Sequence, residues 1–370
     1  MSSSPRFNTL VLALTDLDPD SMRPFLTRLL LTGHTKNVAD PYTTEIQRLD
    51  KALSQLQALA SITLARPYEP LANSAPLLLA EGVLDSIVNL PNIIQLSLNI
   101  DNYYLDRVPN LHKLTHLRIS GFSHSTPEGT ELAFTRMSSL QELHIHPSGN
   151  IMREPFFHCG GDPMQSITPR VIARMQPLRV LMIMDPPEAT KDKSPFLTTE
   201  MFDAIAVKHG PHLKRLTVGS LHVISGAAVD AMKSLLRATA QLIRLTLAFP
   251  EAARRDIIEA AVTMNHLTEM GILVVDQAEA DVAFEQLEMA GQRGPLKALR
   301  EVTFLIPGDA HCVIARSAEV TQSRRYTLRS TQSSSSAHAQ SPQPVDQHRE
   351  PQLKVMWRRW QPFESDIHDK

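Results

Sequence analysis

Histidines are the residues whose type and spacing come closest to a chemical site. His144 and His146 stand two apart, and His116 falls in an earlier, similar segment. Residues two apart on a strand share one face, so an adjacent strand could bring a third imidazole to a zinc ion. The alternative is an ordinary solvated sheet face, because the strand register is inferred and fixes no thiol or carboxylate ligand near these imidazoles. No metal or other cofactor is therefore predicted.

A cysteine nucleophile is the second chemical possibility, since His158 and Cys159 precede Gly160 and Gly161. Such a nucleophile needs a base and a third group that orients the base, and neither has a signal in the sequence, so a loop insertion is the alternative. The Gly-Lys-Ser/Thr phosphate loop, the His-Glu-x-x-His motif and the Gly-x-Ser-x-Gly elbow are absent from the sequence. We expect no enzymatic activity and no catalytic residues.

Composition narrows the class of protein. A chain of 370 residues, 42% hydrophobic, exceeds one compact core and must form several domains or an extended array. The net charge of -2 offers no long-range attraction for nucleic acid or a membrane surface. Two cysteines, Cys159 and Cys312, argue against a disulfide framework. With no apolar run of about 20 residues, we expect a soluble intracellular protein of the cytoplasm or nucleus.

A short repeat indicates which elements position these residues. The pattern is apolar, two variable, apolar, one variable, apolar, and we call each copy a triplet. The last two apolar residues share one face of a short strand, and the first enters the core from the preceding bend. A weaker copy is Phe7, Leu10 and Leu12. The nine clear triplets are Leu59, Ile62, Leu64; Ile93, Leu96, Leu98; Leu114, Leu117, Ile119; Leu140, Leu143, Ile145; Leu178, Leu181, Ile183; Leu213, Leu216, Val218; Leu242, Leu245, Leu247; Leu267, Met270, Ile272; and Leu299, Val302, Phe304.

Between triplets the apolar period changes from two to about 3.6, which is typical of helices. Strands that always return through a helix pair in parallel. The predicted fold is α/β, an irregular leucine-rich-repeat horseshoe (solenoid) with parallel strands on the concave side and helices on the convex side. The alternative is a doubly wound α/β domain, whose strands would read as continuous apolar runs. The expected helices cover 44–56, with Thr44 and Gln47 as a capping box, 78–90, 225–239 and 251–264, with others near 199–209 and 278–290.

The repeat departs from a regular leucine-rich repeat. Successive triplets start 21 to 38 residues apart, against about 20 to 29 in regular repeats, which also place Asn or Cys three positions after the last strand leucine. That polar position holds other residues here: Asp101, Phe122, Ser148, Pro186, Leu221 and Pro250.

Units such as residues 111–119 (LHKLTHLRI) and 137–145 (MSSLQELHI) resemble the repeat half of fungal F-box and related ribonuclease-inhibitor-like proteins. The resemblance covers about residues 1–315. It implies a substrate-recognition module of a ubiquitin ligase, because in that family the repeats hold a substrate while an N-terminal F-box docks the ligase adaptor. Residues 1–40 lack the Leu-Pro-x-Glu start of an F-box. An adaptor is therefore expected only if an F-box exists outside this chain.

The strand residues between the core positions should line the concave face. We call the residues that directly precede the second apolar position of each triplet the first inner column, for example Glu142 and Arg215. The residues two positions later form the second inner column, and those four positions later form the third. Arg and exposed Met are enriched at protein contacts, which predicts a binding centre here, with a solvated sheet face as the alternative. The predicted partner-binding residues are His116, Arg118, Glu142, His144, His146, Met182, Met184, Arg215 and Arg244.

Three segments are predicted: the solenoid in 1–315, a disordered Ser/Gln/Arg-rich segment in 316–350, and a terminal strand or cap in 351–370 containing Trp357 and Trp360. A short binding peptide is the alternative for the last segment. The predicted function is a monomeric, non-catalytic protein–protein interaction scaffold that binds a partner protein on its concave face. The alternatives are a regulator of an enzyme such as a GTPase, and a truncated repeat protein without retained activity.

Overall fold

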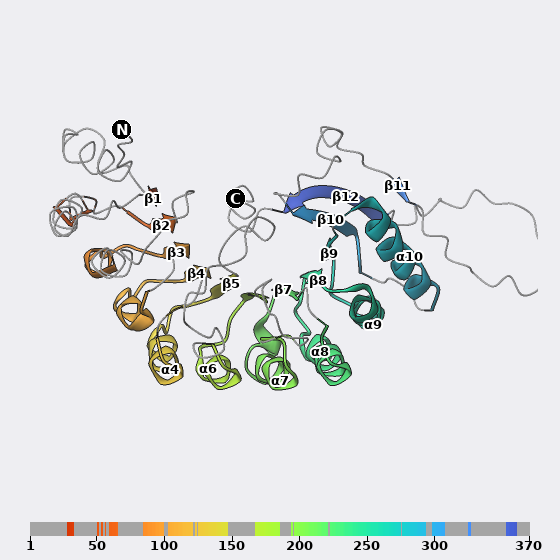
Figure 1. Cartoon of the computed structure of the whole chain (residues 1–370), viewed down its shortest axis with the longest axis horizontal. Coiled ribbons are helices and arrows are strands. Elements are labelled where there is room, and N and C mark those ends of the chain that lie inside the picture. Colours follow the sequence, from red (N-terminus) through yellow and green to blue (C-terminus); the bar gives the residue numbers. More distant parts are fainter. Residues whose placement is uncertain are drawn as a thin grey trace, which may run out of the picture.

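The chain forms an open arc in which strands line the inner side and helices the outer side, as the computed structural model in Figure 1 shows. For strands β1, β11 and β12 the description is of the backbone. The structure describes residues 28–32, 50–51, 53–54, 56, 59–65, 84–99, 103–120, 123, 125–146, 167–185, 194, 196–220, 223–274, 276–293, 298–307, 325–326 and 353–360.

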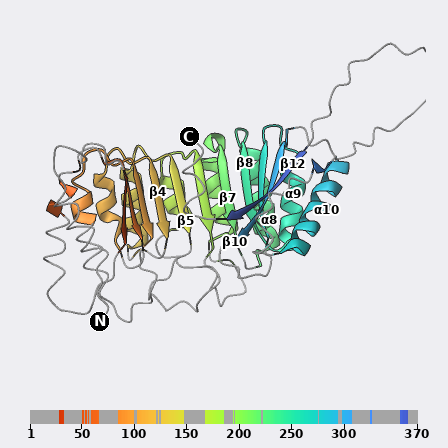
Figure 2. The ribbon, with the colours of Figure 1, turned by 90° about the horizontal axis from the view of Figure 1, so that it is seen from above.

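Twelve strands of the described chain make one sheet, and their spatial order follows the chain from β1 to β10 before β12 and β11 (Figure 2). Neighbours pair in parallel except β11 with β12. A doubly wound sheet reverses its strand order at one point and carries helices on both faces. This sheet has neither feature among the described residues, so the doubly wound alternative is wrong. The strands are β1 (Arg28–Thr32), β2 (Ser61–Ala65), β3 (Gln95–Asn99), β4 (His116–Ser120), β5 (Glu142–His146), β6 (Val180–Met184), β7 (Arg215–Gly219), β8 (Arg244–Ala248), β9 (Glu269–Leu273), β10 (Glu301–Pro307), β11 (Arg325–Tyr326) and β12 (Leu353–Trp360).

The triplets form the core, as predicted. Each residue of the nine triplets is at most 9% exposed. The strands align the triplets without a register shift, so Leu143 of β5 faces Leu181 of β6, and Leu216 of β7 faces Leu245 of β8. A slip of one residue would turn every apolar side chain to the inner face, so burial of the triplets specifies the register.

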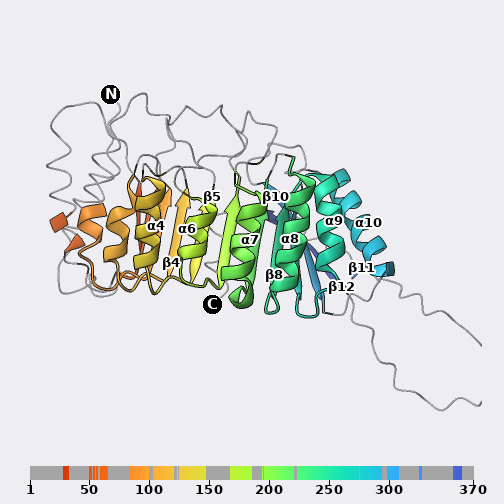
Figure 3. The ribbon, with the colours of Figure 1, turned by 90° about the horizontal axis from the view of Figure 1, so that it is seen from below.

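Helices cover the outer side of the sheet, side by side in chain order (Figure 3). Four of them begin at a Thr or Ser whose hydroxyl accepts a backbone N–H from the first turn, such as Thr126 from Gly129 at 3.1 Å. No helix in the described residues is long and apolar enough to cross a membrane. Described residues 50–51, 53 and 84–87 are helical, within two of the predicted helices, 44–56 and 78–90. The further helices are η2 (Leu105–Asn110), α4 (Pro127–Arg136), α6 (Pro169–Arg174), α7 (Thr199–Lys208), η3 (Gly210–His212), α8 (Gly226–Ala238), α9 (Glu251–Ala261) and α10 (Gln277–Arg293).

Several elements were not predicted. Strand β1 contains Leu29 and Leu31, the last two positions of a further triplet that begins at Leu26 in the sequence and is not among the nine. Helices α4 and α6 were not assigned residue ranges, although each begins with Thr-Pro, a pair favoured at helix starts. The weaker triplet in 7–12 and the capping box at Thr44 and Gln47 lie outside the described residues.

The last strand, β12, lies beside β10 and pairs with it in parallel, so that Val355 faces Val302 and Trp357 faces Phe304. These two register positions are the ones that triplet residues occupy in the preceding strands. Whether β12 caps the solenoid stays a prediction, as do the domain limits at 315 and 350. Most of 316–350 lies outside the described residues.

A backbone ladder joins the repeats at the rim where the chain enters each strand. The carbonyl of the residue preceding one strand accepts two N–H groups from the next repeat: the Arg179 oxygen accepts from Lys214 at 2.8 Å and Arg215 at 3.2 Å. Such bonds occupy backbone groups that would otherwise be unpaired at the end of the strand. We call this the rim ladder. It passes through Ala60, Ile94, Thr115, Gln141, Arg179, Lys214, Ile243, Thr268 and Arg300.

Candidate partner-binding surface

The parallel register brings the candidate residues into the predicted columns. The first inner column contains, in this order, His116, Glu142, Val180, Arg215 and Arg244. Arg118, His144 and Met182 are neighbours in the second. The placement of these residues on one face is therefore as predicted, whereas their role in binding stays a prediction.

Exposure differs sharply between the columns. In the first column Arg215 is exposed, and His116, Glu142 and Arg244 are partly exposed. In the second and third columns Met182 and Met184 are only 6% and 5% exposed. The expectation that these methionines are exposed is therefore wrong, and Arg118 and His144 are buried as well. The side chain of His146 lies outside the described residues.

Lateral packing on the curved inner face explains the buried methionines. Met182, Met184, Ala248 and Leu305 form an apolar cluster separate from the main core, with Leu273 packed against it. We call this the inner apolar cluster. The cluster depends on glycine, because a Cβ added to Gly219 would lie 2.5 Å from the Cβ of Ala248 and 2.7 Å from the Cε of Met184. Met184 thus packs in the space that the missing side chain leaves.

Replacing Gly219 with alanine should lower the free energy of unfolding by about 2 kcal/mol, because the added methyl overpacks the inner apolar cluster. Chemical denaturation of wild type and variant measures the change. The Gly226→Ala variant is the matched control, since a Cβ there meets nothing within 4 Å. Adding Ala248→Gly should restore part of the loss. Full stability of Gly219→Ala alone would contradict this account of the cluster.

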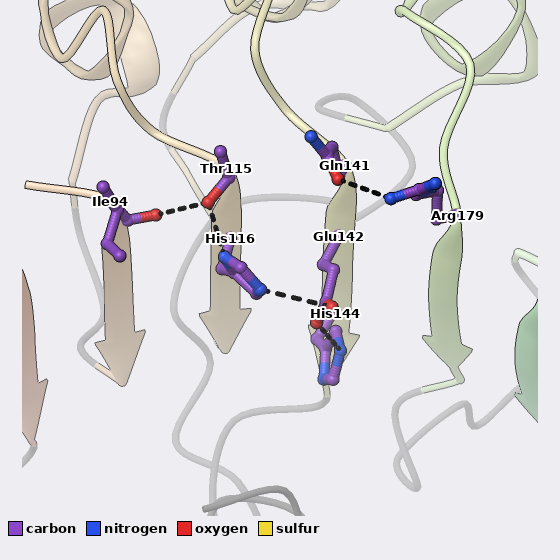
Figure 4. A network of polar contacts seen from close by, with 7 residues as sticks. All are labelled: Ile94, Thr115, His116, Gln141, Glu142, His144 and Arg179. Atoms are coloured by element: carbon purple, nitrogen blue, oxygen red, sulfur yellow. Dashed lines mark hydrogen bonds and ion pairs between the residues drawn. The ribbon is translucent and has the colours of Figure 1, made fainter. Parts of the chain in front are cut away.

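Glu142 is the centre of a polar network on β4 and β5 (Figure 4). Its Oε1 lies 3.2 Å from His116 Nε2, and its Oε2 lies 4.0 Å from His144 Nε2. On its other side the His116 ring contacts the hydroxyl of Thr115 at 2.6 Å, and this hydroxyl donates to the carbonyl of Ile94. The Glu142 carboxylate is thus placed between two imidazoles, one of which is held from both sides.

Charge and burial leave both Glu142 and His144 without their titratable proton near neutral pH. Burial alone would raise the pKa of Glu142, but the hydrogen bond with His116 and the positive charges of His116, Arg215 and Arg118 outweigh it and lower the pKa. Burial, together with the charges of Arg118, His116 and Arg215, lowers the pKa of His144 to about 3. Near neutral pH, Glu142 is therefore a carboxylate and His144 a neutral imidazole.

The chemistry that this network supports is recognition of polar groups, and a carboxylate beside an imidazole is also the pair that moves protons in enzymes. The expectation that the protein is no enzyme stays a prediction. Within the described ranges, no three His, Cys, Asp or Glu side chains lie where they could share a metal ion. The possible nucleophile at His158 and Cys159 lies outside those ranges.

Further along the first inner column, one arginine has an ion-pair partner and the other has none among the described residues. Arg244 Nε lies 3.8 Å from Glu269 Oε2 on the next strand. Glu269 was not among the predicted site residues, although its place beside Arg244 in the column was a usable signal. Arg215, between Val180 and Arg244, makes no ion pair within the described residues. Among the described residues of the first inner column, Arg215 is therefore an exposed cation that a partner could pair with.

Comparisons with known proteins add little to this geometry. No protein-family model and no curated protein sequence matches the chain. Among solved structures, a chain in the crystal structure of the Rad7 and Elc1 complex in yeast is similar with a TM-score of 0.40 and 15% identity. That similarity covers 80% of this chain and 82% of the other. A likeness of this size carries no argument about a partner, so the function is proposed from the surface itself.

Proposed function

We propose that this protein is a non-catalytic interaction scaffold that holds a partner protein against the first inner column, around His116, Glu142, Arg215 and Arg244. The observation that carries the proposal is the exposed guanidinium of Arg215, which lacks an ion pair among the described residues. Arg is enriched at the energetic centre of protein interfaces because its planar fork makes several hydrogen bonds at once. Buried residues of the second inner column, Arg118, His144 and Met182, lie beside the first inner column, two residues further along their strands.

Replacing Arg215 and Arg244 with glutamate together should weaken partner binding at least about tenfold, since both reverse the charge that the partner meets. The measurement is affinity purification with wild-type bait, followed by titration of each captured, purified protein against wild type and variant. The convex control, Arg170→Ala with Lys233→Ala, removes two positive charges from helices α6 and α8 and should bind like wild type.

The variants are chosen by exposure. Arg118 and Met182 are buried, so their truncation would test folding as much as binding. Binding that survives charge reversal at Arg215 and Arg244 in a folded protein would refute the first inner column as the site.

The resemblance to F-box repeat proteins supports a finer proposal, that the scaffold serves as a substrate-recognition module of a ubiquitin ligase. The same purification tests it. Recovery of the ligase adaptor together with the partner supports this role. The proposal is wrong if the captured partner depends on Arg215 and Arg244 and no subunit of a ubiquitin ligase is recovered with it.

A further inference from the structure

A second candidate site lies on the rim of the arc, outside the first inner column. A cavity of about 460 Å³ opens there, lined by Gln141, Pro177, Arg179, His212, Lys214 and Gln241. All six residues shortly precede strands β5 to β8. We call this the rim pocket. Its volume falls within the range of small-molecule sites, which starts at about 300 Å³.

The rim ladder fixes the positions of the charged residues in the rim pocket. Gln141, Arg179 and Lys214 each stand directly before a strand, in three successive repeats. Arg179 N–H donates to the Gln141 carbonyl at 2.8 Å, and Lys214 N–H donates to the Arg179 carbonyl at 2.8 Å. Adjacent strands lie about 4.8 Å apart. The guanidinium and the ammonium therefore start from neighbouring backbone positions and line one cavity.

These two cations have no carboxylate partner within the described residues. Among the described residues no acidic side chain lines the rim pocket, and the Arg179 side chain donates a hydrogen bond from Nη1 to Gln141 Oε1 at 3.4 Å (Figure 4). Like charges on adjacent strands destabilise a sheet. An anion in the pocket would offset that repulsion, whereas nothing described in the chain does.

We propose that the rim pocket binds a phosphate monoester carried on a phosphorylated side chain of a peptide. Arg179 offers a planar fork of donors, Lys214 a second positive charge, and the amides of Gln141 and Gln241 further N–H donors; these groups suit a doubly charged phosphate. The volume exceeds that of a phosphate group and leaves room for the side chain that bears it. A nucleic acid would require a basic stripe along the surface, and the net charge of -2 gives it no support.

The test uses fluorescein-labelled degenerate peptides with a fixed central phosphoserine, phosphothreonine or phosphotyrosine, and the same peptides without phosphate. At least one phosphorylated pool should bind about tenfold more tightly than its unphosphorylated counterpart. Arg179→Ala with Lys214→Ala should abolish that difference, whereas the convex control should retain it. Both substituted residues are exposed, so the thermal midpoint should stay unchanged. Should the alanine variant unfold, Arg179→Gln with Lys214→Gln replaces it.

Three outcomes would overturn the proposal. The first is equal binding of phosphorylated and unphosphorylated pools, and the second is phosphopeptide binding that the double variant leaves intact. The third is preference of the same residues for inorganic phosphate or a single-stranded RNA oligonucleotide over every peptide pool. This site does not depend on the proposed scaffold function, because the Arg215→Glu, Arg244→Glu variant is measured in the partner assay and the rim variant in the peptide assay.

Discussion

The Glu279→Ala variant is expected to lose about 3 kcal/mol of unfolding free energy, because it leaves a buried positive charge without its partner. Arg254 of α9 is 0% exposed, and its Nη1 lies 2.6 Å from Glu279 Oε1 of α10. The Arg254 Nε donates to Gln286 Oε1 at 3.4 Å. These contacts join the last two helices that cover the sheet. Denaturation by urea, followed by circular dichroism, measures the loss.

The control for this prediction is Glu285→Ala, which removes an exposed carboxylate from the same helix and should change stability by less than about 0.5 kcal/mol. The double variant Arg254→Met, Glu279→Leu removes both charges and should recover most of the loss, since an apolar pair of similar volume can replace a buried ion pair. A Glu279→Ala effect as small as that of the control would show that the Arg254 charge is solvated in the native state.

The His209→Ala variant is expected to lose a similar amount, about 3 kcal/mol, because two buried backbone groups lose their hydrogen bonds. His209 Nδ1 accepts the N–H of Leu178 at 3.1 Å, and Nε2 contacts the carbonyl of Ile172 at 2.9 Å. One imidazole thus joins α6, the approach to β6 and the end of α7. The bonds require the neutral ring with its proton on Nε2.

Stability should therefore fall in acid. Burial, assisted by the charges of Lys208 and His212 and opposed by the hydrogen bond to Ile172, lowers the pKa of His209 from 6.5 to about 4. The folded state favours the neutral ring, so its contribution is complete above pH 6.5 and is lost as the pH falls toward 4. Buried His144, with its pKa of about 3, acts in the same direction.

The measurement for His209 is urea unfolding of wild type, His209→Gln and His212→Gln between pH 7.5 and 4.5. The stability gap between wild type and His209→Gln should narrow as the pH falls, because the variant has no group to titrate there. The exposed His212→Gln should stay within about 0.5 kcal/mol of the wild type, since the charge of His212 is the smallest of the causes that act on the pKa of His209. Parallel curves for wild type and His209→Gln would contradict a neutral, buried His209.

The strand register could be read from the sequence to a large extent. Leu143, Leu181 and Leu216 were assigned to one buried row from their triplets alone, and the structure aligns them so. This works because each triplet must be buried, and only one alignment of short strands buries all of them. The missed triplet at Leu26, Leu29 and Leu31 was present in the sequence, whereas the short α6 has only its Thr-Pro start as a signal.

The binding face could be predicted only as a set of columns. The alternation of residues assigns Met182 and Arg215 alike to the inner face, yet one is buried and the other exposed. Met182 belongs to the inner apolar cluster, whose close packing of Met184 depends on the missing side chain of Gly219, whereas Arg215 lies outside that cluster. The alternation of residues along a strand predicts the direction in which a side chain points. It does not predict how closely side chains from other repeats surround it.

By itself, then, the sequence determined the triplet core, the parallel order of the strands and the membership of each inner column, since these follow from burying apolar residues at a local period. Tertiary structure alone decided which inner residues meet solvent, that a cavity opens at the rim, and that Arg254 lies beside Glu279. Arg254 and Glu279 are separated by 25 residues of chain by their numbering. The lengths of the intervening loops and helices set such contacts, and no local pattern records them.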